Sequence, residues 1–231
     1  ADQIAAVGSA ISAVAPADGA EHAITIVSAA DQAGNGGATT VSFTALEGIT
    51  SLSVGAGIEV ELSDDAVNDL VATVATATSA GYTSVGLVLD STAVASVSAS
   101  AKTTLTTGST PAIAAGFAYS IKDEASNIIT ADASDGTYIS GANSVTVTDA
   151  ISISNFNTID AKASGNIILT GGISDTAANI APSGIAAAGF TAATTQDPDV
   201  AVTIIGTDPT FAELNAIAGA TSGIVTASIS D

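Results

Sequence analysis

Residues 144–149, SVTVTD, read as a short β-strand that ends on an aspartate. Valine and threonine alternate along this stretch, and the alternation is typical of a strand with one buried face. Similar stretches, rich in small and β-branched residues and closed by an aspartate, recur along the chain. They include IEVELSD at 58–64, SVGLVLD at 84–90, IILTGGISD at 167–175 and IVTASISD at 224–231. This recurrence predicts a repeated structural unit.

The closing aspartates are regularly spaced. They are Asp31, Asp64, Asp90, Asp123, Asp149, Asp175, Asp208 and Asp231. Six of the seven intervals are 26 or 33 residues, and periods of roughly 20 to 50 residues indicate solenoids and other repeat arrays. We therefore expect an atypical N-terminal cap or strand over residues 1–30, followed by a repeat array over residues 31–231. The units of that array are expected to end near Asp64, Asp90, Asp123, Asp149, Asp175, Asp208 and Asp231.

The segments after the aspartates favour short helices. Examples are DDAVNDLVATV at 64–74 and DPTFAELNAIAGA at 208–220. An aspartate just before a helix can accept a hydrogen bond from a free amide of the first turn, so we expect these aspartates to be N-caps.

Two further patterns complete the expected unit. Phe and Leu or Ile stand three residues apart at 43–46, 156–159 and 211–214, a spacing that places both side chains on one helical face. Glycines such as Gly57 and Gly223 precede the strands and can supply the bend that leads into them.

Together these patterns predict an α/β repeat fold, a solenoid of parallel strands in which each strand is followed by a short helix or turn. The alternative is a mainly β fold, either a β-solenoid or a pair of β-sandwiches. That alternative stays open because segments such as ISISNFNTIDAKA at 151–163 are rich in poor helix formers.

The composition excludes several functions. The 231 residues carry 23 acidic side chains, three lysines and no arginine, which gives a formal charge of -20. We expect no nucleic-acid partner, because phosphate contacts require Lys and Arg. The chain has no cysteine, hence no disulfide framework, and no apolar run reaches the roughly 20 residues of a membrane span. Position 1 is not Met, so we expect a processed protein or a segment of a longer one.

One local motif is a candidate calcium site. In ADASDGTYISGAN, residues 131–143, the side chains of Asp132, Ser134 and Asp135 offer oxygen ligands close together, and Gly136 allows a turn. The alternative is a plain β-turn, since no acidic residue closes the loop as it would in an EF-hand. Calcium is therefore the only cofactor that the sequence suggests, and the abundance of carboxylates favours it over other cations.

The sequence favours a protein that is not an enzyme. His22 is the only histidine, and no G-x-S-x-G nucleophile motif accompanies it. Pairs of carboxylates suited to glycoside hydrolysis occur at Asp64 and Asp65, Asp123 and Glu124, and Asp197 and Asp199. Helix capping and solvated loops explain these pairs more simply.

The segments DTAANIA at 175–181, SGIAAAGF at 183–190 and DPTFAELNAIAGATSGIVTASISD at 208–231 resemble the Ala/Thr/Asp-rich repeats of large bacterial cell-surface proteins. These are S-layer-like proteins and giant adhesins exported by type I secretion. The resemblance covers residues 140–231 most clearly and implies an extracellular, cell-surface, structural or adhesive role, often with bound calcium. The Gly-Gly-x-Gly-x-Asp nonapeptides of calcium-binding RTX tails do not occur in this sequence.

From the repeats and the resemblance we expect an extracellular structural protein that self-assembles into a surface layer or filament. Its partner would be itself, because the open edge of a stacked sheet is a template for pairing with another copy. The alternative function is an adhesin or binding module that recognises a glycan or another surface, with calcium as a candidate requirement.

Overall fold

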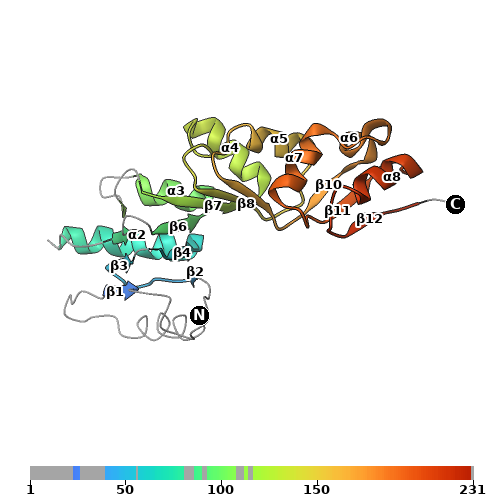
Figure 1. Cartoon of the computed structure of the whole chain (residues 1–231). Helices are drawn as coiled ribbons and strands as arrows, with labels where there is room; N and C mark the ends of the chain where they lie inside the picture. Colours follow the sequence, from blue (N-terminus) through green and yellow to red (C-terminus); the bar gives the residue numbers. More distant parts are fainter. Residues whose placement is uncertain are drawn as a thin grey trace, which may run out of the picture. The chain divides into compact units, whose positions relative to one another are not determined.

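The computed structural model describes residues 23–26, 40–55, 57–80, 86–89, 93–107, 112–113 and 117–229. It divides into two compact units, Ala1–Ser120 and Ile121–Asp231. Figure 1 shows the chain coloured from blue at the N-terminus to red at the C-terminus. Each unit is described by itself.

Unit 1 contains two parallel sheets. One has the order β1-β3-β5, and the other has the order β2-β4-β6. The strands are β1 (Ala23–Ile26), β2 (Thr40–Phe43), β3 (Ser51–Val54), β4 (Glu59–Leu62), β5 (Gly86–Leu89) and β6 (Val94–Val97). The helices α2 (Asp64–Ser79) and α3 (Ala99–Thr106) follow β4 and β6. Each successive strand of a sheet therefore runs in the same direction as the one before it.

Unit 2 repeats this arrangement. Strands β7 to β9 pair in parallel in chain order, and so do β10 to β12. The strands are β7 (Tyr119–Asp123), β8 (Ser144–Val147), β9 (Asn166–Leu169), β10 (Ile173–Thr176), β11 (Val202–Ile205) and β12 (Val225–Ala227). The helices are α4 (Ala125–Asp135), α5 (Ile153–Asp160), α6 (Ala177–Ile180), the short 3₁₀ helix η2 (Pro182–Gly184), α7 (Ala188–Gln196) and α8 (Phe211–Ala218). Figure 1 shows the helices of this unit on one side of its strands.

The chain is an α/β protein with parallel sheets, which confirms the predicted class. Seven α-helices lie within the described residues, so the mainly β alternative is wrong. No described helix has the length and apolar composition needed to cross a membrane.

The strand register does not follow the spacing of the aspartates. Strand β4 pairs with β6 rather than with β5, because Glu59 lies beside Val94. In the other unit Asp123 lies beside Val147 rather than beside Asp149. The layers are therefore offset from the 26- and 33-residue intervals. Three of the aligned aspartates lie outside the described residues, namely Asp31, Asp90 and Asp231, and so does most of the expected N-terminal cap.

The helices begin on hydroxyl caps, so the expected aspartate caps are wrong in detail. The N-cap of α2 is Ser63, whose Oγ accepts a hydrogen bond from the amide of Ala66 at 3.1 Å. Asp64 is instead the first residue of that helix. The hydroxyl caps of the other helices are Ser98, Ser152, Thr176 and Thr210.

The Phe-x-x-Leu/Ile pattern has mixed outcomes. Residues 156–159 lie in α5, with both apolar side chains buried as predicted. Residues 211–214 lie in α8, but Phe211 is exposed. The helical prediction for 43–46 is wrong, because Phe43 belongs to strand β2. It is nevertheless buried.

Successive layers approach so closely at their bends that a side chain would not fit. A Cβ atom added to Gly165 would lie 1.8 Å from the carbonyl oxygen of Asn143, and one added to Gly223 would lie 2.3 Å from that of Val200. Real Cβ contacts are never this short. The glycines are thus required by close backbone approach between layers.

Candidate functional site

Carboxylates in unit 2 reach back to the preceding layer. Asp149 Oδ1 accepts a hydrogen bond from the backbone amide of Ala125 at 2.7 Å, and Asp175 Oδ2 accepts one from that of Ile153 at 2.9 Å. Ala125 and Ile153 are the first residues of α4 and α5. Their amides have no partner within the helix, so an acceptor from the next layer satisfies them. These aspartates therefore bond to helices that precede them in the chain.

Further side chains make bonds between segments that are 19 to 34 residues apart. Asp69 Oδ2 accepts from the Leu46 amide at 3.0 Å. Asp197 Oδ2 accepts from the Leu169 amide at 2.8 Å. Hydroxyl donors of the same kind are Ser63 to Thr44 O, Ser98 to Asp64 Oδ1, Ser164 to Ser140 O, and Thr170 to Val147 O. Short polar side chains thus join the layers in both units.

The aspartates of β7 and β10 share a second arrangement. Asp123 Oδ1 accepts hydrogen bonds from the next backbone amide and from the side-chain amide of Asn127. Asp175 Oδ1 does the same with its next amide and Asn179, at 2.8 Å and 2.7 Å. Asp175 is buried and uses both carboxylate oxygens, one within its own layer and one toward α5. It is therefore a link between two layers.

Asp132 forms a buried ion pair with Lys162. Its carboxylate is 1% exposed, accepts a hydrogen bond from the Ile139 amide at 2.9 Å through Oδ1, and binds the Lys162 ammonium through Oδ2. Burial raises the pKa of this carboxyl, but the hydrogen bond from Lys162, the bond from Ile139 and the lysine charge outweigh burial and hold the pKa below its ordinary value. Asp132 is therefore ionised at neutral pH.

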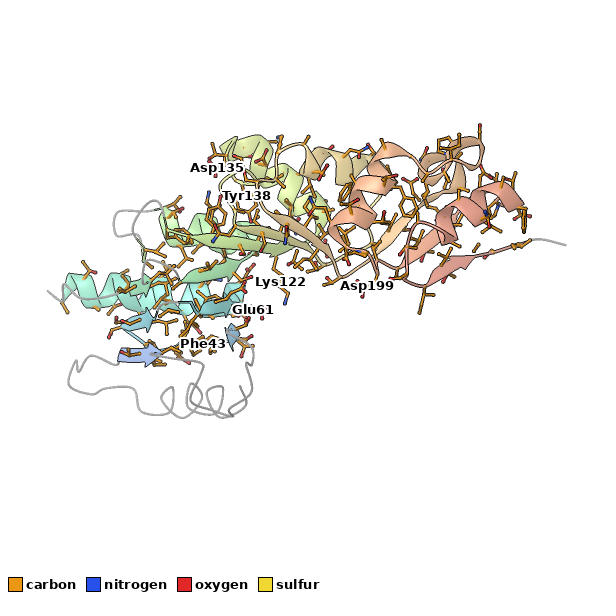
Figure 2. The ribbon with its side chains drawn as sticks, in the orientation of Figure 1. Phe43, Glu61, Lys122, Asp135, Tyr138 and Asp199 are labelled. Carbon is orange, nitrogen blue, oxygen red and sulfur yellow. The ribbon has the colours of Figure 1, made fainter. Side chains whose placement is uncertain are left out.

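The three residues of the predicted calcium site have different surroundings. Asp132 is buried near the C-terminal end of α4, with a lysine as its cation. Ser134 is exposed, and its hydroxyl donates to the Thr130 carbonyl oxygen at 3.1 Å. Asp135 is also exposed, accepts from the Thr137 hydroxyl at 3.2 Å, and lies at the outer end of α4 (Figure 2). Calcium binding here stays a prediction, and no cluster of three or more His, Cys, Asp or Glu side chains occurs among the described residues.

The other predicted acidic pairs lie in local structure. Asp64 and Asp65 are exposed in the first turn of α2. Asp197 bonds to Leu169, whereas Asp199 is exposed, and Figure 2 labels it. His22 lies outside the described residues.

The last described layer presents an apolar face that the sequence analysis did not single out. Strand β12 pairs with β11, and among the described residues no strand lies on its other side. Phe211, the first residue of α8, is 85% exposed. Leu214, Val225 and Ala227 are half-buried. These four residues, Phe211, Leu214, Val225 and Ala227, are named here the end face.

Three comparisons with known proteins give no match. No family model matches the sequence, and neither a curated protein nor a solved structure does so. The function proposed below therefore depends on the sequence and the structure alone.

Proposed function

We propose that this chain is an extracellular structural protein, built as an α/β solenoid, that self-assembles into a surface layer or filament on a cell. It acts as a scaffold and carries out no catalysis. Its mechanism is the stacking of similar strand–helix layers, each of which supplies the acceptors that the neighbouring layer needs.

The observation that carries this proposal is the pair of hydrogen bonds from Asp149 to Ala125 and from Asp175 to Ile153. Each bond satisfies the first amide of a helix with a carboxylate from the following layer. A layer of this kind completes its hydrogen bonding only when another layer lies on it. Stacking is thus a property of the unit, as in other quasi-one-dimensional repeat proteins.

The charge distribution supports a role outside the cell and contact between copies at the strand edges. With a formal charge of -20, two copies repel one another unless their contact surfaces are neutral. Strands β2 and β12 contain no charged residue. The scarcity of Lys and Arg also leaves few sites for trypsin-like proteases, which suits an exposed surface protein.

A binding module is the second candidate, and one observation favours it. In the sheet β10-β11-β12, Ser174, Thr203 and Thr226 lie side by side in register. A row of hydroxyls on neighbouring strands is a surface that can bind a glycan through repeated hydrogen bonds. Binding of labelled chain to a glycan array, reduced by Thr203→Val, would support this candidate.

Size-exclusion chromatography with light scattering tests self-assembly. We expect the measured mass to rise well above the 22.0 kDa of one chain as the concentration increases. Parallel runs in a chelator and in CaCl₂ separate assembly from calcium dependence. A mass of one chain at every concentration and in both buffers contradicts the proposed function.

A further inference from the structure

Helices α5 and α8 carry the same apolar pattern but differ in how it is covered. Both begin after a hydroxyl cap, and both place apolar residues at their first, fourth and seventh positions. In α5 these are Ile153, Phe156 and Ile159, all buried. In α8 they are Phe211, Leu214 and Ile217, of which only Ile217 is buried.

The layer that follows α5 explains why its pattern is buried. Asp175 of β10 binds the amide of Ile153, the first residue of α5. Helix α7 approaches α5 so closely that a Cβ atom added to Gly189 would lie 2.2 Å from the side-chain oxygen of Asn157. Strand and helix of one layer together therefore cover the helix of the layer before. Nothing in the described residues does this for α8.

Strand β12 shows the same incomplete burial. Val225 and Ala227 lie in register with Val202 and Ile204 of β11. Both β11 residues are buried, whereas both β12 residues are half-buried. The inward positions of the last layer are thus apolar, like those of interior layers, but less covered.

We propose that the end face binds a second copy of this chain, which adds a parallel strand to β12 and covers Phe211. The interior layers define this occupant, because each is covered by a strand and helix that run in the same direction as its own. This inference rests on the proposed function and names the surface through which assembly takes place.

The second copy must offer a strand edge of the opposite kind. In a parallel sheet the two edges of a strand are not equivalent, so β12 can add only a strand whose edge facing the preceding layer is open. Among the described strands of unit 1, β1 and β2 pair only with β3 and β4, the strands that follow them in their sheets. We assign β2 as the partner of β12, since Thr40 and Ser42 are exposed and match the hydroxyl row that ends at Thr226.

The face is also suited to contact between two acidic chains. Its strand is uncharged, and the one charged residue of α8 is Glu213. That carboxylate accepts hydrogen bonds from the amide and the hydroxyl of Thr210, which hold its pKa below the ordinary value. Glu213 is therefore committed to the cap of its own helix.

Sedimentation velocity of matched variants tests the face. Phe211→Glu places a charge on the end face while leaving α8 formed, because an acidic residue in a first helical turn is favourable. Ile168→Glu is the control, since Ile168 is 45% exposed on β9, away from the end face. We expect the concentration for half-assembly to rise roughly 30-fold for Phe211→Glu, as for a hot-spot residue, and to stay within about twofold for the control. Circular dichroism checks that both variants keep the wild-type helix content.

The outcomes separate this inference from the proposed function. If wild type and Phe211→Glu assemble equally, or if both variants lose assembly equally, the end face is not the contact, although self-assembly stands. If wild type stays monomeric, both proposals fall.

Cross-linking tests the assignment of β2. Because the chain has no cysteine, single Thr226→Cys and Thr40→Cys variants can be mixed and treated with a short bismaleimide. We expect dimers that contain one of each variant. Dimers formed by Thr226→Cys alone, without mixed dimers, would overturn the parallel arrangement.

Discussion

Asp175 Oδ2 accepts a hydrogen bond from the backbone amide of Ile153 at 2.9 Å, across 22 residues of sequence. The bond joins the carboxylate of β10 to the first turn of α5. Asp149 and Ala125 repeat it one layer earlier. A helix of this protein is thus capped twice, by a hydroxyl of its own layer and by a carboxylate of the next.

Replacing Asp175 with Ala removes this link. The change leaves the buried Ile153 amide without its acceptor and also removes the bonds to Thr176 and Asn179. We expect the free energy of unfolding to fall by about 2–3 kcal/mol, the typical value for hydrogen bonds to a charged group. Urea denaturation measures it. Asp199→Ala, at an exposed aspartate, is the control and is expected to change stability by less than about 0.5 kcal/mol. Equal effects of the two substitutions would remove the special role of Asp175.

Lys162→Met tests the buried ion pair. Without the ammonium, the Asp132 carboxylate keeps only the Ile139 amide as a partner while buried. Loss of a fully buried partner costs about 3–5 kcal/mol, but Lys162 is 46% exposed and water will replace part of its interaction. We therefore expect a loss of about 1.5–3 kcal/mol in urea denaturation. Lys162→Arg keeps the charge and should retain most of the stability. A neutral Lys162→Met variant would show that the pair contributes nothing.

The same carboxylate predicts a dependence on pH. The folded-state pKa of Asp132 lies below its ordinary value of 3.8, so the group stabilises the fold above that pH, and the contribution is lost as the pH falls through the folded-state pKa. The acidic chain also repels itself less at low pH, so the informative quantity is the stability difference between wild type and Asp132→Asn. We expect this difference to be constant from pH 7 to about pH 5 and to shrink below about pH 4. A difference that stays constant throughout the acid range would contradict the assignment.

Gly165→Ala tests the close approach of layers. The added Cβ would lie 1.8 Å from the Asn143 carbonyl oxygen, so one backbone must move. We expect a loss of about 2–4 kcal/mol, which is in the range of severe single substitutions. Gly219→Ala is the control, because Gly219 has φ −79° and its nearest contact would be 3.1 Å. Thermal unfolding should place the control within about 1 kcal/mol of wild type. If Gly165→Ala were as stable as the control, the layers would be less tightly stacked than described here.

Much of the local structure could be predicted from the sequence. Alternation identified β4 and β8, and the apolar period after Asp64 identified α2. The segment 167–175 reads as one strand but forms parts of β9 and β10, since Gly172, with φ +75°, turns the chain between them. At 43–46 a spacing of three residues predicted a helix. Four residues are too few to separate that pattern from a strand, and pairing with β4 made it a strand.

The bonds between layers could not be predicted, because they join residues that are distant in sequence. The aspartates were recognised as caps, but the amide that each one accepts lies in the preceding layer, and no local pattern indicates it. The ion pair between Asp132 and Lys162 spans 30 residues. Its one signal was the rarity of lysine, since a chain with three lysines has few cations for its buried carboxylates.

Negative-stain electron microscopy of the purified chain, in EDTA and in CaCl₂, tests the proposal of stacked layers most directly. We predict filaments or ordered sheets whose thickness along one direction equals a single chain, in both buffers if the strand edges alone drive assembly and only with CaCl₂ if calcium joins the acidic surfaces. Separate particles of one chain in both buffers, at concentrations where light scattering reaches its plateau, would contradict it.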